Sequence, residues 1–329
     1  MSCEISVLIP VYGVEPYIKR CAESLLNQTF KEGVELIFIN DATEDRSIGI
    51  LEETVSAYPD YPGTVRIINH DVNRGLPAAR NTGLDNATGK YIVHIDGDDY
   101  AGSGMLETLY NAAEENDADF VWCDYYIDFG NKKRIIRQPS FGSPEEAVCG
   151  MLRGSMKYNV WNKICRRSIY KDNGIRFPEG YAMGEDLTMI MVALHSSKCA
   201  YVGKALYNYV QNEGQMTAAY NEEKLESLRF NCDRIRSYIE NRFPESGLES
   251  EYAALCQLMK WPFLLDGKKS SYRRWQNWFP ESDRYIWQTR GVNIRIKLVE
   301  WCAAKGLYPL VRLHYFLIIK LFYGIVYGK

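Results

Sequence analysis

The sequence lacks an excess of charge of either sign. Its 329 residues contain 39 Lys and Arg against 42 Asp and Glu, a formal net charge of −3. A protein that binds nucleic acid over a wide surface normally carries a basic excess, so this balance argues against a nucleic-acid partner. The hydrophobic share of 46% and the charged share of 25% are typical of folded domains, which excludes a disordered or collagen-like chain.

The nine cysteines include no close pair. Any two of them are at least 16 residues apart, which excludes CxxC metal and redox motifs. Most stand among apolar neighbours, where a thiol behaves as a small buried hydrophobe. The start of the chain is not basic, and its apolar run at 5–10 is too short for a signal peptide. We therefore expect reduced thiols and a cytoplasmic protein.

Glycine-rich phosphate loops are also missing. There is no GxGxxG after the first expected strand and no GxxxxGK[ST] anywhere in the chain. Such loops hold a dinucleotide or a triphosphate with backbone N–H groups. Their absence argues against an ordinary dehydrogenase or a P-loop enzyme, and any nucleotide bound here needs another group to neutralise its phosphates.

The first 126 residues alternate between strand and helix patterns. Short, continuous apolar segments predict strands, and amphipathic or proline-initiated segments between them predict helices. Such alternation is typical of a mostly parallel sheet with helices on both faces. The sequence therefore predicts an α/β, Rossmann-like domain. The expected strands are 5–10, 34–39, 65–68, 91–95 and 120–126.

The remainder of the chain has two further patterns of predicted secondary structure. From about residue 127 to 220, Gly, Pro and Asn interrupt short elements, and one helix is clear at 187–194. Beyond residue 221 the apolar spacing becomes helical. We expect one domain at 1–220, followed by a helical C-terminal region at 221–329.

Polar and acidic side chains follow each expected parallel strand, at the sheet edge where open α/β sheets bind ligands. The densest group is Asp96, Asp98 and Asp99. Carboxylates are hard oxygen ligands that suit Mg²⁺ or Mn²⁺ shared with substrate phosphates. The alternative is a solvated turn whose carboxylates cap the helix expected at 103–116.

Three other polar positions each allow a structural and a functional interpretation. Asp41 is either a turn residue or an acceptor for a base imide N–H. Arg80 and its neighbour Asn81 either lie on the helix at 77–89 without a further role or contact a nucleotide. Glu185 and Asp186 stand at the first turn of the helix at 187–194, where the helix dipole favours acids. The same dipole would keep Asp186 ionised, as a general base must be.

Together these segments resemble the inverting glycosyltransferases of family 2, which have the GT-A fold, of the bacterial surface-polysaccharide type. The resemblance covers about residues 4–220. Departures from the family pattern are Asn40 in place of an Asp, Ala42 in place of a Gly and Gly13 in place of a frequent Asn. The matching segments are 5–18, 38–47, 73–89, 91–99, 161–167, 174–179 and 184–186.

The resemblance implies a role for each matching residue. Asp96 and Asp98 match the DxD pair that contacts the ribose and the metal-bound diphosphate, so they are the expected ligands of Mn²⁺ or Mg²⁺. Asp186 matches the catalytic base, with Glu185 nearer the acceptor. Arg80 matches an arginine near the nucleotide. The residues that match the nucleoside pocket are Pro10, Tyr12, Glu15 and Asp41.

The implied activity is metal-dependent, inverting transfer of a hexosyl or N-acetylhexosaminyl group. The donor is expected to be a nucleotide-diphosphate sugar, a UDP-sugar, and the acceptor a hydroxyl of a glycan or lipid-linked molecule in polysaccharide biosynthesis. The alternative is a catalytically inactive sugar-nucleotide-binding or scaffolding protein of the same fold. That alternative would need a broken DxD or Glu-Asp element, and both are intact. The absence of a QxxRW run argues against a processive synthase.

Residues 308–327 form an aromatic and aliphatic segment interrupted by Arg312, His314 and Lys320. No apolar run reaches the ~20 residues that a spanning helix needs. The pattern fits either a helix in the membrane interface, at the inner face of the cell membrane, or a helix packed on protein, including a homodimer. Residues 290–329 carry a net charge of +6, which leaves −9 for the rest of the chain.

Overall fold

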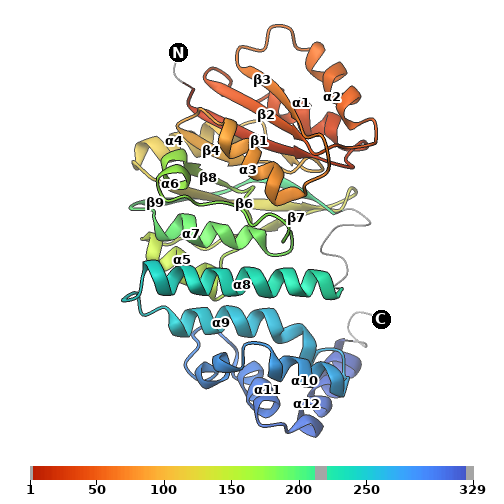
Figure 1. Ribbon diagram of the computed structural model, residues 1–329, viewed down its shortest axis with the longest axis vertical. Helices are drawn as coiled ribbons and strands as arrows, with labels where there is room; N and C mark the ends of the chain where they lie inside the picture. The colour runs from red at the N-terminus through yellow and green to blue at the C-terminus, as the bar shows by residue number, and fades with distance from the viewer. Residues whose placement is uncertain (1–2, 212–220, 324–329) are drawn as a thin grey trace. The chain divides into compact units, whose positions relative to one another are not determined.

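The computed structural model describes residues 3–211 and 221–323 (Figure 1). Contacts divide the chain into two compact units: unit 1 is Met1–Val148 with Lys157–Ile235, and unit 2 is Cys149–Met156 with Arg236–Lys329. Residues 212–220 of the predicted first domain and 324–327 of the predicted aromatic segment lie outside the described residues. The boundary between the two units falls within helix α8 (Glu222–Arg242). The domain division at residue 220 stays a prediction.

Four parallel strands form one half of the sheet in unit 1. They are β1 (Ile5–Val11), β2 (Val34–Asn40), β3 (Thr64–Asn69) and β4 (Tyr91–His94), in the order β3-β2-β1-β4. Val11 lies opposite Asn40, so the loops that follow β1 and β2 leave the sheet at the same edge. The residues of β1, β2 and β4 are almost all buried, as expected for continuous apolar strands covered on both faces.

The other half of the sheet is mixed. β8 (Lys163–Arg166) runs antiparallel to β4 and to β6 (Phe120–Asp128), and β6 is parallel to β9 (Cys199–Val210). Two short strands, β5 (Tyr100–Ala101) and β7 (Lys133–Ile136), pair antiparallel with β9 and β6. The α/β fold class is confirmed, while β5, β7, β8 and β9 were not expected from the sequence. Three of them have two to four residues, too short to show a period.

Helices follow the strands of the parallel half. Those of the first 115 residues are α1 (Ile18–Leu26), α2 (Ser47–Ser56), α3 (Leu76–Asn86) and α4 (Met105–Glu115). α3 packs on β1 and β2, which brings its side chains to the edge where these strands end. Later elements are α5 (Pro144–Leu152), α6 (Arg167–Asp172), the 3₁₀ turn η1 (Glu185–Leu187) and α7 (Thr188–Leu194).

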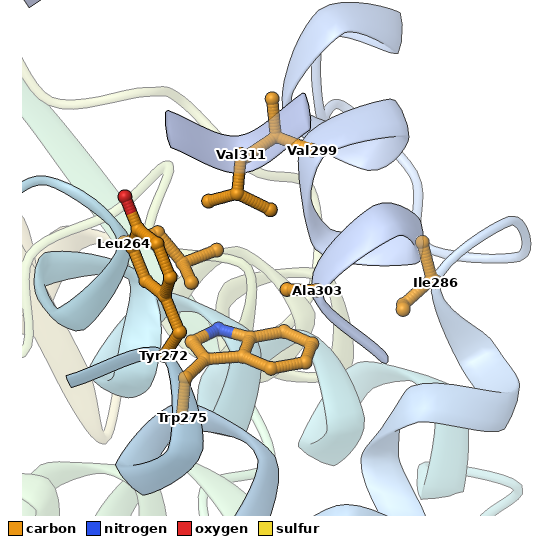
Figure 2. Packing of buried hydrophobic residues seen from close by; sticks show 7 residues of the cluster. All are labelled: Leu264, Tyr272, Trp275, Ile286, Val299, Ala303 and Val311. Atoms are coloured by element: carbon orange, nitrogen blue, oxygen red, sulfur yellow. The ribbon is translucent and has the colours of Figure 1, made fainter. Parts of the chain in front are cut away.

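Unit 2 is built around a core of buried side chains contributed by its helices (Figure 2). That core comprises Leu264, Tyr272, Trp275, Ile286, Val299, Ala303 and Val311. The helices are α9 (Glu249–Lys260), α10 (Lys269–Asn277), α11 (Ile294–Ala304) and α12 (Tyr308–His314), with 3₁₀ turns η2 (Trp261–Leu264) and η3 (Pro280–Tyr285) and a π-helical segment η4 (Tyr315–Tyr323). Over the residues the structure describes, no helix has the length and apolarity to cross a bilayer.

Ala42 adopts a left-handed backbone conformation, with φ of 55°. An L-residue with a Cβ is disfavoured there, whereas glycine adopts this conformation readily. This is the position at which the family pattern has a glycine. The loop after β2 therefore keeps its conformation in this chain at the expense of local strain.

We expect Ala42→Gly to raise the free energy of unfolding by about 0.5–1 kcal/mol, because glycine relieves this strain. Urea denaturation followed by tryptophan fluorescence measures the change. Ala112→Gly, inside α4, is the matched control and should lower stability by about 1 kcal/mol. Equal destabilisation by both substitutions would contradict the strain argument.

Candidate functional site

Hydrogen bonds join the loop after β1 to the loop after β2. The backbone N–H of Gly13 donates to Oγ1 of Thr43 at 2.9 Å, and that of Glu15 donates to Oδ2 of Asp45 at 3.0 Å. In return, the N–H of Arg46 donates to Oε2 of Glu15 at 3.0 Å. The carboxylate of Glu15, predicted to line a nucleoside pocket, thus fixes the shape of these two loops.

Pro10 and Tyr12 stand at the end of β1, beside the acidic turn after β4. A Cβ on Gly97 would lie 2.8 Å from the carbonyl oxygen of Pro10, so only glycine lets the two loops approach this closely. The side chain of Tyr12 is 55% exposed. An exposed aromatic ring beside polar loops can stack on a planar ligand group.

Asp41 is buried and acts as an anchor for the loop that leads into α3. Its Oδ1 accepts from the N–H of Arg74 at 2.8 Å, and its Oδ2 accepts from the N–H of Gly75 at 2.7 Å. Nδ1 of His70 lies 2.7 Å from Oδ1, and Nε2 of the same ring lies 2.8 Å from Oγ1 of Thr82. The sequence assigned no role to His70, because its partner is 29 residues away.

Arg80 is the centre of an ion cluster. Its Nη1 lies 2.7 Å from Oδ1 of Asp186 and 3.1 Å from Oε1 of Glu185, and its Nη2 lies 3.1 Å from Oδ1 of Asp96. The residue is only 1% exposed. Three segments meet at this guanidinium: α3, the turn after β4, and η1. The structure thus brings together four residues that the sequence assigned separately to the nucleotide, the metal and the acceptor.

The charges of this cluster perturb one another. Burial opposes the charge of Arg80, but the carboxylates of Asp186, Asp96 and Glu185 outweigh burial and raise the pKa of Arg80. Burial and the negative charge of Asp186 raise the pKa of Glu185 to about 8. Burial also raises the pKa of Asp186, and Arg80 opposes that rise. Ionisation of Asp186 therefore depends on Arg80, rather than on the helix dipole alone.

The acidic turn after β4 divides its carboxylates between two tasks. Asp99 is buried and accepts hydrogen bonds from the hydroxyl of Tyr207 and the N–H of Val210, both at 2.7 Å. Burial and the charge of Asp98 raise the pKa of Asp99. Asp99 thus ties the turn to β9, whereas Asp96 and Asp98 are partly exposed.

A divalent cation fits this turn only together with a ligand that adds oxygen atoms. In residues 3–211 and 221–323, no three His, Cys, Asp or Glu side chains are arranged to hold an ion by themselves. Asp96 contacts Arg80 through Oδ1, which leaves its Oδ2 for another partner. Mg²⁺ and Mn²⁺ commonly use one or two carboxylates and complete their coordination with phosphate oxygens and water. Asp96 and Asp98 match that pattern.

Two buried asparagines, to which the sequence assigned no such function, position the segment that carries Glu185 and Asp186. Asn81 exchanges two hydrogen bonds with the backbone of Phe177, both at 2.9 Å. Asn231 of α8 donates to the carbonyl oxygens of Tyr181 and Met183 at 3.1 and 3.0 Å. Asn231 stands on the apolar face of α8, and a polar residue there is the signal that would have found it.

Lys163 is a further buried polar residue of unit 1 that the sequence did not single out. Its Nζ donates to the carbonyl oxygens of Lys157 and Asn159, at 2.9 and 2.6 Å, and to Oδ1 of Asn162 at 2.8 Å. Burial lowers its pKa to about 8. Its three acceptors lie within six residues of it, so Lys163 holds the chain just before β8 in place.

Comparison with known proteins adds an independent finding. Residues 6–184 match the model of Glycosyl transferase family 2, more than half of the chain. The uncharacterized glycosyltransferase EpsJ of Bacillus subtilis (strain 168) is 32% identical over 224 residues, 65% of this chain and 62% of that protein. The poly(ribitol-phosphate) beta-glucosyltransferase of Bacillus spizizenii is 33% identical over 228 residues, 66% of this chain and 34% of that protein. The chain thus spans less than two thirds of either relative.

Solved structures share the fold. Residues 1–349 of S. aureus TarS, in complex with UDP-GlcNAc, superpose with a TM-score of 0.74 at 21% identity, covering 95% of this chain and 91% of that one. The mannosyltransferase PcManGT from Pyrobaculum calidifontis, in complex with GDP-Man and Mn²⁺, gives a TM-score of 0.57 at 14% identity, with 96% and 84% covered. The family match and the shared fold agree with the resemblance seen in the motifs, and the chain belongs to glycosyl transferase family 2.

Proposed function

We propose that this protein is a metal-dependent, inverting glycosyltransferase that uses a UDP-sugar as donor. The acceptor is a hydroxyl of a glycan or lipid-linked molecule in the biosynthesis of a bacterial surface polysaccharide. The observation that carries the proposal is the cluster in which Arg80 joins Asp96 to Glu185 and Asp186. It links the acidic turn expected at the donor diphosphate to the carboxylate expected at the acceptor.

The choice of a UDP-sugar rests on the relatives and on the nucleoside side of the site. TarS binds UDP-GlcNAc, and the Bacillus spizizenii relative is named as a glucosyltransferase. A carboxylate offers about four acceptor sites, and Asp41 uses three of them within the protein. The remaining site on Oδ2 suits the imide N–H of uracil, and Tyr12 supplies a ring for stacking.

On the donor side, Asp98 and Asp96 would hold Mn²⁺ or Mg²⁺ together with the diphosphate. When bound, such a cation supplies positive charge that stabilises the departing nucleoside diphosphate. The chain's own part is to keep the turn in shape, which Asp99 does through Tyr207. PcManGT, which shares the fold, is a precedent for Mn²⁺.

On the acceptor side, Asp186 is the proposed general base. It takes the proton of the acceptor hydroxyl while that oxygen attacks the anomeric carbon from the face opposite the leaving diphosphate, which inverts the centre. The electrons of the broken glycosidic C–O bond leave with the diphosphate. The Asp186 side chain is 20% exposed against 10% for Glu185, so Asp186 is the more accessible carboxylate. Glu185 retains a proton near neutral pH, which limits the negative charge beside the base.

We further propose that the enzyme works in the cytoplasm, at the inner face of the cell membrane, without a nucleic-acid partner. The nine cysteines form no disulfide, in agreement with a reducing compartment. Homodimer formation, predicted as one alternative for residues 308–327, stays a prediction.

Replacing Asp186 by Asn should lower sugar transfer at least 1,000-fold, on the order expected for loss of a positioned base. UDP affinity should change less than about two-fold, since Asp186 is expected at the acceptor and not at the nucleoside. Release of UDP from UDP-glucose and UDP-GlcNAc, with water or a glycan as acceptor, measures the reaction. Exposed Asp172→Asn is the matched control. Undiminished UDP release by the Asp186→Asn enzyme would remove Asp186 from the mechanism.

UDP should bind at least about 10-fold more tightly with Mn²⁺ than with EDTA, because the cation shares its coordination between Asp98 and the diphosphate. Asp98→Ala should abolish that gain, while Mn²⁺ without UDP should bind only weakly. Isothermal titration calorimetry of UDP in Mn²⁺ and in EDTA, and of Mn²⁺ without UDP, gives the three values. Equal UDP affinity in Mn²⁺ and EDTA would exclude the metal assignment.

The raised pKa of Glu185 predicts a pH-dependent stability. The folded protein holds this proton up to about pH 8, whereas the unfolded chain loses it near 4.5, the ordinary pKa of a glutamate. Stability therefore falls as the pH rises from about 5 to 8, by up to about 1 kcal/mol per pH unit. Glu185→Gln should lose this dependence. Unfolding free energies of both proteins at several pH values test this, and parallel pH curves would contradict it.

A further inference from the structure

Unit 2 carries a concentration of exposed apolar side chains on α11, α12 and the segment that follows. Of the sixteen large hydrophobic side chains exposed in the described chain, nine fall between residues 287 and 317, with exposed fractions of 37–62%. A cluster of this kind on a folded protein marks an interaction surface. The nine are Trp287, Ile294, Leu298, Trp301, Leu307, Leu310, Leu313, Phe316 and Leu317, and we call them the apolar face.

The packing of the two helices places much of this face on one side. Val299 of α11 and Val311 of α12 point into the same core (Figure 2). Each residue turns a helix by about 100°, so Leu298, one residue before Val299, lies about 100° away from it around α11. Leu313, two residues after Val311, lies about 200° away from it around α12, on the side opposite the core. Arg295, at the start of α11, lies 3.1 Å from the ring of His314, at the end of α12. The helices therefore run antiparallel side by side, and their outward sides adjoin.

The polar side chains around the apolar face are basic. Glu300 is the one acid between residues 286 and 323, and it is 2% exposed, so this stretch presents no carboxylate on its surface. Its basic residues are Arg290, Arg295, Lys297, Lys305, Arg312 and Lys320. All of them reach the surface, and Lys297 is the least exposed of the six.

We propose that the apolar face and its basic residues dock on an anionic lipid surface. Leucine, phenylalanine and tryptophan side chains enter the boundary between headgroups and acyl chains, and Lys and Arg side chains contact lipid phosphates. Trp287 and Trp301 suit the same interfacial zone.

Charge argues against a second copy of the chain as the occupant. A two-fold symmetric interface places the same patch of one subunit against that of the other. The six cations would then face their own copies, with no exposed carboxylate in the stretch to compensate. An anionic bilayer meets both requirements, apolar burial and negative charge. This inference concerns unit 2 alone and does not depend on the transferase proposal.

Co-sedimentation of the full chain with vesicles tests the proposal. At low salt we expect binding to phosphatidylcholine vesicles that contain phosphatidylglycerol and little binding to phosphatidylcholine alone. Leu298→Ser combined with Leu313→Ser should weaken binding about 10-fold or more, since each leucine loses apolar area buried in the interface. Exposed Ile135→Ser, on β7 of unit 1, is the matched control and should bind like the parent.

A variant with fewer basic residues tests the electrostatic part of the proposal. Its vesicle binding still tests the proposal if circular dichroism shows that the leucine variant does not fold. Arg290→Gln, Lys305→Gln and Arg312→Gln together should weaken binding about 100-fold, at roughly five-fold per basic residue near an anionic surface. The matched control changes Lys132, Lys171 and Lys204 to Gln.

Three results would overturn the proposal. The first is equal or absent binding to both kinds of vesicle. The second is an equal loss of binding in the charge variant and its control. The third is a parent dimer that the leucine variant converts to a monomer in sedimentation equilibrium without lipid, which would assign the face to a second copy.

Discussion

The site depends on one buried guanidinium that serves three carboxylates. Arg80 is enclosed by protein, and an enclosed cation without partners would be far more costly than the ion pairs it makes. The converse also holds: without Arg80, Asp96, Glu185 and Asp186 would repel one another in a poorly hydrated space. Each segment that contributes to the cluster is therefore held in register with the others by the balance of charge. Burial, together with the negative charge of Asp186, raises the pKa of Glu185 so that it holds a proton near neutral pH.

This arrangement has a consequence for catalysis. A guanidinium lowers the pKa of a neighbouring carboxyl group. Arg80 therefore keeps Asp186 ionised and at the same time makes it a weaker base. Burial acts in the opposite direction, so the pKa of Asp186 depends on the balance between burial and the charge of Arg80. Asn81 and Asn231 matter for the same reason, because they fix the backbone between Phe177 and Met183 and hence the distance from Asp186 to Arg80.

The sequence predicted the parallel half of the sheet well, because each strand is a continuous apolar run and each following helix has either an apolar stripe or, as in α3, a proline at its start. It predicted little of the mixed half, where β8 has four residues and is held by Lys163 and by pairing with distant β4 and β6. For the site, acids at a strand end located Asp96 and acids at the start of a helix located Asp186, but neither pattern could bring the two together. The link is Arg80, and a contact across 106 residues leaves no local pattern.

The distribution of charge follows from the same electrostatics. An acidic site can bind an anionic donor only if cations intervene, so the negative balance of the first 289 residues agrees with a site that recruits a divalent ion. The basic surplus of α11 and α12 has no such internal purpose, because Glu300, the one acid within that stretch, is buried and cannot balance six cations. Exposed cations that repel one another beside exposed leucines lower stability and solubility in water. Such a surface becomes favourable only against a phase that is both apolar and negatively charged.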